Sequence, residues 1–351
     1  MVLDLDTLAR ALGLVPHEPL VGYAEDLAFG RLTRCLGPAM PAAVAGSWLS
    51  GVHGDVSVFV IPHRHDGGLG WEPRTAFVAP IEPPLFLGLD LHERSLLRDR
   101  LGRNDVRIGF PGFDSSVHAS ADDAARLTWF LAPWRRDSFE LLSTIARAVK
   151  QGLRVTDSTV TIFRPMLPDP RDARESLALA TWIARVLSHR SHASTPTPDE
   201  QARAHRWHEL ARRRGLAFDP RRMCITGEIE GDLVEIVLEP MPAAPVTAFT
   251  MTLAGAPSEL HVRKRGYRAP WGVVEPPVTV LDEDGRSAAL DDALRDALAR
   301  LAGASRELRI DGETLAWVTG ACAYESEIEA ALTTGIAVAR AMPRLGQRPY
   351  R

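Results

Sequence analysis

The chain has 351 residues, of which 45% are hydrophobic and 25% are charged, the balance of an ordinary globular protein. This length suits two domains of about 150 residues, each long enough to bury a core. The net charge of −4 argues against a general electrostatic attraction to nucleic acid or to an anionic membrane.

Signals for export or membrane insertion are not evident in the sequence. The first ten residues carry Asp4 and Asp6 where a secretory signal would carry basic residues, and no apolar stretch approaches the length of about 20 residues of a spanning helix. The cysteines Cys35, Cys224 and Cys322 lack CxxC spacing and predict buried thiols rather than disulfides or a zinc site. We therefore expect a cytoplasmic protein with no membrane partner.

The first half of the chain predicts a short helix, a run of strands and then helices. Alternating β-branched residues such as Val56, Val58 and Val60 are typical of a strand with one buried face. Ser120 is the expected N-cap of the second helix. We expect strands at 46–52, 55–61, 74–80, 84–91 and 105–109, a hairpin at 153–163 across Asp157-Ser158, and helices at 6–14, 121–131, 137–150 and 170–189.

The second half predicts the same order of elements. A stretch with Pro196 and Pro198 among Ser and Thr is the expected linker, over residues 191–199. Asp311-Gly312 between apolar alternations indicates a hairpin, because both turn residues tolerate positive φ. We expect strands at 224–230, 232–238, 246–253, 259–264 and 278–281, a hairpin at 308–318, and helices at 200–214, 291–301 and 325–341.

Short sequence echoes run through both halves in one order. Leu8-Ala9-Arg10 returns as Leu210-Ala211-Arg212, and Gly54-Asp55-Val56 returns as Gly231-Asp232-Leu233. Further pairs are Thr75-Ala76-Phe77 with Thr247-Ala248-Phe249, Pro83-Pro84 with Ala256-Pro257, and Leu153-Arg154-Val155 with Leu308-Arg309-Ile310. The shared order predicts an internally duplicated module.

Runs of strands followed by helices indicate an α+β fold, because no strand–helix–strand alternation is present to build a parallel sheet. We expect repeats at 1–190 and 200–351, each an antiparallel sheet covered by helices. The two repeats are expected to face each other as a pseudo-dimer, although an end-to-end arrangement stays open. The closing helices should pack through Leu177, Ile183 and Val186 in the first repeat, and through Ile328, Leu332 and Ile336 in the second.

Three histidine clusters are candidate metal ligands. His63 and His65, with Asp66, would share an ion if both imidazoles lie on one strand face, but a solvated loop is favoured. The pairs His189 and His192, and His205 and His208, have helical spacing but lack the His-Glu-x-x-His order of a zinc enzyme. We expect no metal site, no cofactor and no catalytic residue, since no P-loop, GxGxxG or GxSxG motif is present.

Two sets of residues are candidate contact sites. Trp71 and Trp271 lie in glycine- and proline-bearing stretches and are expected to be exposed anchors for a partner. The basic run Arg212, Arg213 and Arg214 would touch phosphates or an acidic partner, although a solvated helix end is the simpler interpretation.

The sequence therefore favours a non-catalytic binding, scaffold or accessory protein that acts through protein–protein contacts. The alternative is a metal-dependent or small-molecule-processing enzyme with a cleft between the repeats. A pocket for a small apolar ligand between sheet and helices is a third option. A protein partner is expected, nucleic acid is not, and a homo-oligomer stays open.

Overall fold

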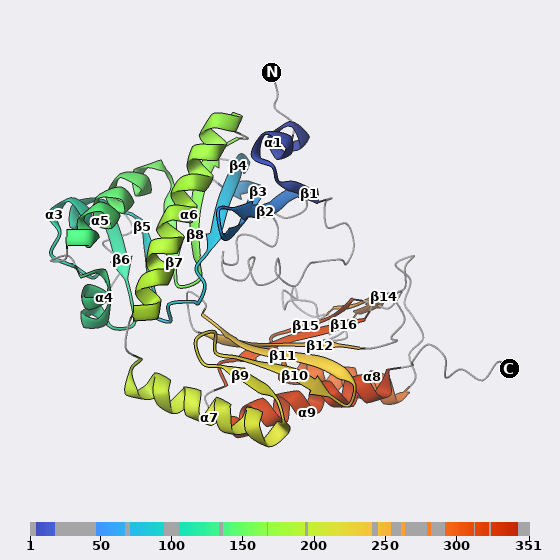
Figure 1. Ribbon diagram of the computed structural model, residues 1–351. Coiled ribbons are helices and arrows are strands. Elements are labelled where there is room, and N and C mark those ends of the chain that lie inside the picture. Colours follow the sequence, from blue (N-terminus) through green and yellow to red (C-terminus); the bar gives the residue numbers. More distant parts are fainter. Residues whose placement is uncertain are drawn as a thin grey trace, which may run out of the picture. The chain divides into compact units, whose positions relative to one another are not determined.

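The computed structural model describes residues 5–17, 47–66, 71–94, 105–132, 136–166, 168–193, 196–240, 245–253, 261–263, 279–281, 292–311, 313–322 and 324–342. Two compact units divide the chain. Unit 1 comprises Met1–Thr195 and Pro240–Ala244, and unit 2 comprises Pro196–Glu239 and Pro245–Arg351. The fold is mixed α+β, with one antiparallel sheet in each unit (Figure 1).

The sheet of unit 1 has the strand order β1-β2-β3-β4-β8-β7-β5-β6. All of its described pairings are antiparallel. The strands are β1 (Val15–His17), β2 (Trp48–His53), β3 (Val56–Asp66), β4 (Trp71–Pro80), β5 (Asp90–Glu93), β6 (Val117–Ser120), β7 (Leu153–Thr156) and β8 (Thr159–Pro165).

The described helices of unit 1 are α1 (Leu5–Leu12), α3 (Pro111–Ser116), α4 (Ala124–Leu131), α5 (Arg136–Ala148) and α6 (Pro170–Ala193), with the 3-10 turn η1 (Val149–Gln151). The long helix α6 crosses the sheet over β4 and β8 (Figure 1). Leu177 and Ile183 of α6 are buried in the core of unit 1, and Val186 packs against it. The predicted packing face of this helix is confirmed.

The strand expected at 84–91 is largely wrong. Residues 81–89 form an irregular segment, and only β5 follows it. Phe86 and Gly88 have positive φ, and the amides of residues 87–89 all donate to the Asp157 carboxylate, at 2.9, 2.8 and 3.2 Å. Amides that converge on one side chain are not available to a β-ladder, so this segment is held by the β7–β8 turn instead.

The segment before α4 also differs from the expectation. Residues 105–109 are not a strand, although the Val106 amide bonds the Ala119 carbonyl at 2.7 Å beside β6. Ser120 ends strand β6, and the N-cap of α4 is Asp123, whose carboxylate accepts from the amides of Ala125 and Arg126. Strand β6 has only four residues and lies between two polar turns, so it shows no clear alternation in the sequence. The start of α4 was therefore predicted too early in the chain.

The sheet of unit 2 has the order β9-β10-β11-β12-β16-β15-β13-β14, again with antiparallel pairings. Its strands are β9 (Ala217–Asp219), β10 (Cys224–Ile229), β11 (Asp232–Glu239), β12 (Val246–Thr252), β13 (His261–Arg263), β14 (Thr279–Leu281), β15 (Glu307–Asp311) and β16 (Thr314–Gly320).

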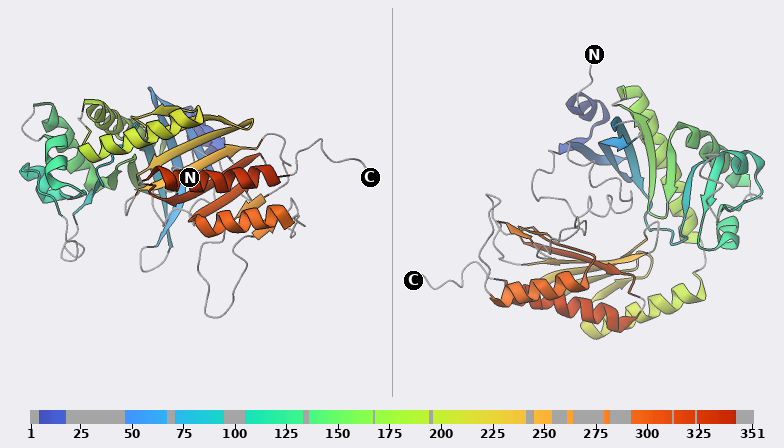
Figure 2. Two further views of the ribbon diagram at one scale, coloured as in Figure 1. Left: turned by 90° about the horizontal axis from the view of Figure 1, so that it is seen from below. Right: turned by 180° about the vertical axis from the view of Figure 1, so that it is seen from behind.

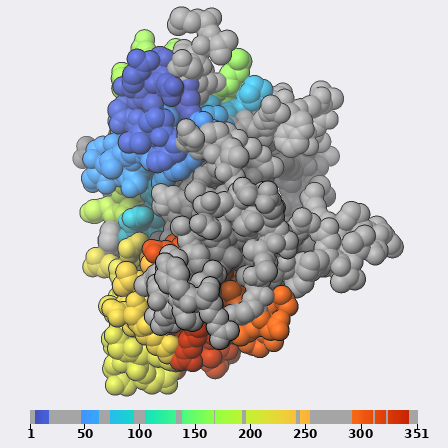
Figure 3. Space-filling view, turned by 90° about the vertical axis from the view of Figure 1, so that its right-hand side faces the viewer, coloured from blue at the N-terminus to red at the C-terminus, as the bar shows by residue number. Residues whose placement is uncertain are grey.

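The described helices of unit 2 are α7 (Pro198–Arg214), α8 (Asp292–Ala304) and α9 (Glu325–Ala341). Helices α8 and α9 lie side by side on one face of the sheet (Figure 2), and their outer surfaces adjoin in the space-filling view (Figure 3). Ile328, Leu332 and Ile336 of α9 are buried, which confirms the predicted packing face of the second closing helix.

Strands in the two sheets occur in the same order when each is numbered from its own start. Phe77 pairs with Ile162 in unit 1, and Phe249 pairs with Trp317 at the same place in unit 2. The sequence echo that matches Phe77 with Phe249 therefore joins equivalent positions.

In the first hairpin of each unit, the alignment given by strand pairing is shifted by one residue from the alignment given by the sequence echo. Leu49 pairs with Val60, and Ile225 pairs with Ile236, so the turn residue Gly54 corresponds to Glu230 rather than to Gly231. Register is set by the pairing of the strands, and short sequence matches at a turn do not fix it.

An arginine of each closing helix is bonded to the turn of that first hairpin. Arg185 of α6 donates to Asp55 at 3.0 Å through Nε, and Arg340 of α9 donates to Glu230 at 2.9 Å through Nε. The two helices are thus placed on their sheets in the same way.

The boundary between the units lies within the expected linker, but the linker is shorter than predicted. Helix α6 continues to Ala193, and α7 begins at Pro198. Thr197 and Glu200 form a capping box, in which the Thr197 side chain accepts from the Glu200 amide and the Glu200 carboxylate accepts from the Thr197 amide. The cap explains why helix begins inside this Pro- and Ser-rich stretch.

Candidate functional site

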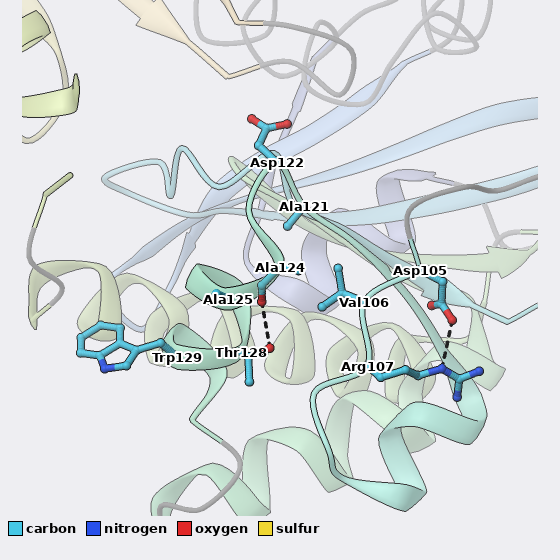
Figure 4. Close-up of a pocket in the computed structure, with 9 residues that line it drawn as sticks. All are labelled: Asp105, Val106, Arg107, Ala121, Asp122, Ala124, Ala125, Thr128 and Trp129. Atoms are coloured by element: carbon cyan, nitrogen blue, oxygen red, sulfur yellow. Dashed lines mark hydrogen bonds and ion pairs between the residues drawn. The ribbon is translucent and has the colours of Figure 1, made fainter. Parts of the chain in front are cut away.

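A hollow of about 890 Å³ opens on the surface of unit 1 beside α4 (Figure 4). Ala124, Ala125, Thr128 and Trp129 of α4 line one side of it. The irregular segment around Asp105 and Arg107 lines the other side. Small alanines leave space along the helix, and Trp129 stands at one end of it.

The packing of α4 explains why Trp129 is exposed. Leu127, Phe130 and Leu131 are buried on the sheet side of the helix, which turns Trp129 outward with 51% of its surface exposed. The helix is fixed at its start by the Asp123 cap. A large aromatic side chain on a capped helix is a preorganised surface for contact.

A charged network continues from the hollow along the outer surface of β5 and β6. Asp105 accepts hydrogen bonds from Arg94 Nη2 at 2.9 and 2.8 Å, and Arg107 Nε lies 3.2 Å from its Oδ2. On β5, Asp90 accepts from Arg154 Nε and Nη2, both at 2.9 Å. Each carboxylate is therefore held in place by at least one arginine.

Two histidines lie between these carboxylates. His92 of β5 pairs directly with His118 of β6, and their ring centroids are 4.8 Å apart. His92 Nδ1 lies 3.6 Å from Asp90 Oδ1, and His118 Nδ1 lies 3.5 Å from Asp105 Oδ1. The result is two carboxylate–histidine pairs that meet across the strands, with both Nδ1 atoms buried.

The Asp90 carboxyl stays ionised over the whole physiological range. Burial acts to raise its pKa, but the neighbouring His92 ring and the hydrogen bonds from Arg154 outweigh burial and lower the pKa to about 2. This network thus holds a fixed negative charge beside His92.

The described residues do not test the contact role predicted for the two tryptophans. Trp71 is the first residue of β4, where it pairs with Asp66, and so belongs to a strand end rather than to a loop. Nothing further is described for its side chain, and Trp271 lies outside the described residues. Their contact role stays a prediction.

The basic run at the end of α7 has carboxylate partners within unit 2. Arg212 donates to Glu209 at 2.9 Å through Nη2, Arg213 forms an ion pair with Glu325, and Arg214 Nε donates to Glu329 at 3.1 Å. The pairs of Arg213 and Arg214 join α7 to α9, whereas the Arg212 pair lies within α7. The arginines are exposed, so their predicted contact with an acidic partner stays untested.

The histidines considered as metal ligands lie on strands and helices. His63 and His65 belong to β3 rather than to a loop, and α6 continues beyond His192 instead of ending between His189 and His192. His205 and His208 are on an exposed face of α7, as expected for a solvated helix. Among the described residues, no group of three or more His, Cys, Asp or Glu side chains is placed to hold a metal ion.

The sequence matches no protein-family model and no curated protein. One solved structure, the crystal structure of the mycobacterial trehalose monomycolate transport factor A, TtfA, aligns over 42% of this chain and 99% of its own chain, with 15% identity and a TM-score of 0.29. A likeness at this level supports no conclusion about fold or function. None of the described helices is long and apolar enough to cross a membrane.

Sequence reasoning missed both features of this surface. The exposure of Trp129 has a sequence signal, because the spacing of Leu127, Phe130 and Leu131 along one side of a helix places Trp129 on the opposite side. The meeting of His92 and His118 had no sequence signal, because they lie on two short strands separated by a long connection.

Proposed function

We propose that the protein is a non-catalytic binding or scaffold protein that acts through protein–protein contacts, and that the hollow beside Trp129 is its contact surface. The exposed Trp129 side chain carries this proposal. The cytoplasmic location expected from the sequence is part of the same proposal.

The chemistry of the hollow suits a protein partner. Protein interfaces commonly place an aromatic anchor at the centre and polar groups at the rim. Here Trp129 and the two alanines of α4 offer apolar surface, while Asp105 and Arg107 offer charges of both signs. We therefore expect the partner to place an apolar side chain against Trp129 and polar groups over the Asp105–Arg107 side.

We further propose that the two units descend from one duplicated module arranged as a pseudo-dimer. The common strand order, the equivalent places of Phe77 and Phe249, and the bonds of Arg185 and Arg340 to their hairpin turns support the duplication.

The test uses a photo-crosslinking amino acid placed at position 129 of the full-length chain in its native host. Position 324 is the matched control, because Tyr324 is an aromatic residue of unit 2 that is also more than half exposed. We expect a defined set of proteins to crosslink from position 129 and to be absent from position 324, and mass spectrometry identifies them. Crosslinks to a second copy of the chain would make the surface a homo-oligomer interface.

The purified partner then gives an affinity. Trp129→Ala should weaken binding at least tenfold, the loss expected when an interface anchor is truncated, whereas Tyr324→Ala should leave the affinity unchanged. Equal affinities for the parent and Trp129→Ala, with an unchanged circular dichroism spectrum, would remove this surface from consideration. Detection of a substrate turned over by the pure protein would favour the enzyme alternative.

A further inference from the structure

We propose that the partner segment bound in the Trp129 hollow carries a basic side chain, lysine or arginine, that pairs with Asp122. This inference rests on the function proposed for the hollow and adds the charge of the partner to it. The Asp122 carboxylate and the Trp129 indole, which both line the hollow, carry the inference.

Most other polar side chains of the hollow are already bonded within unit 1. Asp105 accepts from Arg94 Nη2 at 2.9 and 2.8 Å, and Arg107 Nε lies 3.2 Å from the same carboxylate. The Thr128 hydroxyl donates to the Ala124 carbonyl at 2.8 Å. A partner therefore meets side chains here whose hydrogen bonds and charges are largely satisfied.

Asp122 differs from these groups because its charge is not paired. Its amide donates to the Leu87 carbonyl at 2.9 Å, which fixes the backbone, while the side chain is exposed. The next carboxylate, Asp123, caps α4 by accepting from the amides of Ala125 and Arg126. The Asp122 carboxylate has no hydrogen bond or ion pair with any residue in the described part of the chain.

A second carboxylate adds to the negative charge at this end of the hollow. Gly88 has a φ of 67°, and a Cβ there would overlap the Asp122 carboxyl group. The Gly88 amide donates to the Asp157 carboxylate at 2.8 Å. Burial raises the pKa of Asp157 to about 6, so this carboxyl is still largely ionised at about pH 7.5. Two negative charges thus lie against one glycine, and both attract a cation.

The exposed indole of Trp129 favours a ligand of the same charge. Figure 4 shows Asp122 and Trp129 on either side of Ala124 and Ala125. An aromatic face carries the negative part of the ring quadrupole, so it attracts cations as well as apolar groups. Lysine and arginine also have long apolar stems, which suit the surface of the two alanines.

The opposite side of the hollow orients such a ligand. Arg107 lines that side, where it is bonded to Asp105 and donates to the Asp114 carbonyl at 2.7 Å. A second cation beside Arg107 would be repelled, whereas a cation beside Asp122 is attracted. We therefore expect the basic side chain of the partner at the start of α4.

Fluorine NMR of the full chain labelled with 5-fluorotryptophan tests the inference at about pH 7.5. The Trp129 signal is identified by its loss in Trp129→Phe. The probes are capped hexapeptides of alanine and glycine that contain one leucine and one arginine at each relative spacing, with matched peptides in which glutamate or glutamine replaces arginine. We expect an arginine peptide to shift the Trp129 signal and to bind at least tenfold more tightly than its glutamate counterpart.

Variants of Asp122 separate a direct pair from a general effect of charge. Asp122→Asn should weaken binding of the arginine peptide at least threefold, and Asp122→Arg should reverse the preference in favour of the glutamate peptide. The matched control is Asp199→Asn, because Asp199 is an exposed carboxylate at the start of α7 in unit 2; it should leave the affinity unchanged. If the Asp122 variants do not fold, the comparison of the peptides on the parent protein decides.

Equal binding of the arginine and glutamate peptides overturns the inference. So does an unshifted Trp129 signal at about 1 mM arginine peptide, or an arginine preference that folded Asp122→Asn retains. These failures differ from a failure of the proposed function, because crosslinking from position 129 detects a partner of any charge. A crosslinked partner together with no preference for the arginine peptide would leave the contact surface in place and remove only its basic ligand.

Discussion

Units 1 and 2 have the same strand order and yet fill the space between sheet and closing helix differently. In unit 2, Trp317 stacks on Phe249, with ring centroids 4.9 Å apart, and the helix carries Gly335 where a Cβ would overlap the indole ring. Unit 1 has Ile162 at the strand position of Trp317.

The helix position of Gly335 is occupied by Ala180 in unit 1, since both residues lie five positions before the arginine that bonds the hairpin turn. The pair Trp317 and Gly335 of unit 2 thus corresponds to the pair Ile162 and Ala180 of unit 1. The comparison teaches that a larger strand side chain in unit 2 is accommodated by a smaller residue on the closing helix.

The largest expected effect concerns the position that is fully buried in both closing helices. Ile183→Asp should bury an unpaired charge and cost about 4 kcal/mol or more, enough to unfold unit 1. Val338→Asp, at the equivalent place in α9, should do the same to unit 2. Hydrogen exchange followed by mass spectrometry shows which unit loses protection.

Matched controls use exposed positions of the same helices, Ala178→Asp in α6 and Thr333→Asp in α9. Both should unfold at nearly the parent temperature. If Val338→Asp left unit 2 as protected as in the parent, the two helices would not be equivalent in their packing.

A second effect should distinguish the units by pH. Burial raises the pKa of Asp157 to about 6, against three amide hydrogen bonds that lower it and the nearby Asp122 charge that raises it further. The pKa of Asp157 is higher in the folded protein than in the unfolded chain, so the protonated carboxyl group stabilises the fold of unit 1. This contribution to the free energy of unfolding is complete below about pH 4 and is lost as the pH rises through 6. The full difference corresponds to about 3 kcal/mol.

Urea unfolding between pH 4 and pH 7.5 measures how the free energy of unfolding changes with pH. Asp157→Asn should remove this pH dependence from unit 1, because the amide does not titrate. Unit 2 should lack it, since the sequence has Gly312 at the equivalent turn position. An unchanged slope in Asp157→Asn would show that another group titrates.

The smallest expected effect tests the exchange of volume itself. Gly335→Ala should cost about 1 to 3 kcal/mol, because the added methyl overlaps Trp317. The double variant Trp317→Ile with Gly335→Ala recreates the pair found in unit 1. It should lose less stability than the sum of the two single changes, and thermal unfolding of all four proteins gives the coupling. Strict additivity would argue against equivalent packing, and so against the proposed duplication.

The sequence by itself determined most of the regular elements. The sequence predicted α9 at its observed bounds, with the spacing of Ile328, Leu332 and Ile336 on one face, and the Asp157-Ser158 turn predicted the β7–β8 hairpin. These features depend on residues close together in the chain, where helical spacing and turn preferences act directly. The antiparallel α+β class followed from the order of such elements.

Only the tertiary structure decided the irregular segment at 81–89 and the surface that carries the proposed site. The Asp157 carboxylate accepts hydrogen bonds from three amides of the segment that the sequence predicts as a strand. These bonds join residues about 70 positions apart. His92 and His118 likewise meet because β5 and β6 pair, with arginines supplied from a third strand and from the segment before β6. Contacts of this kind depend on strand pairing, and no local pattern in the chain specifies them.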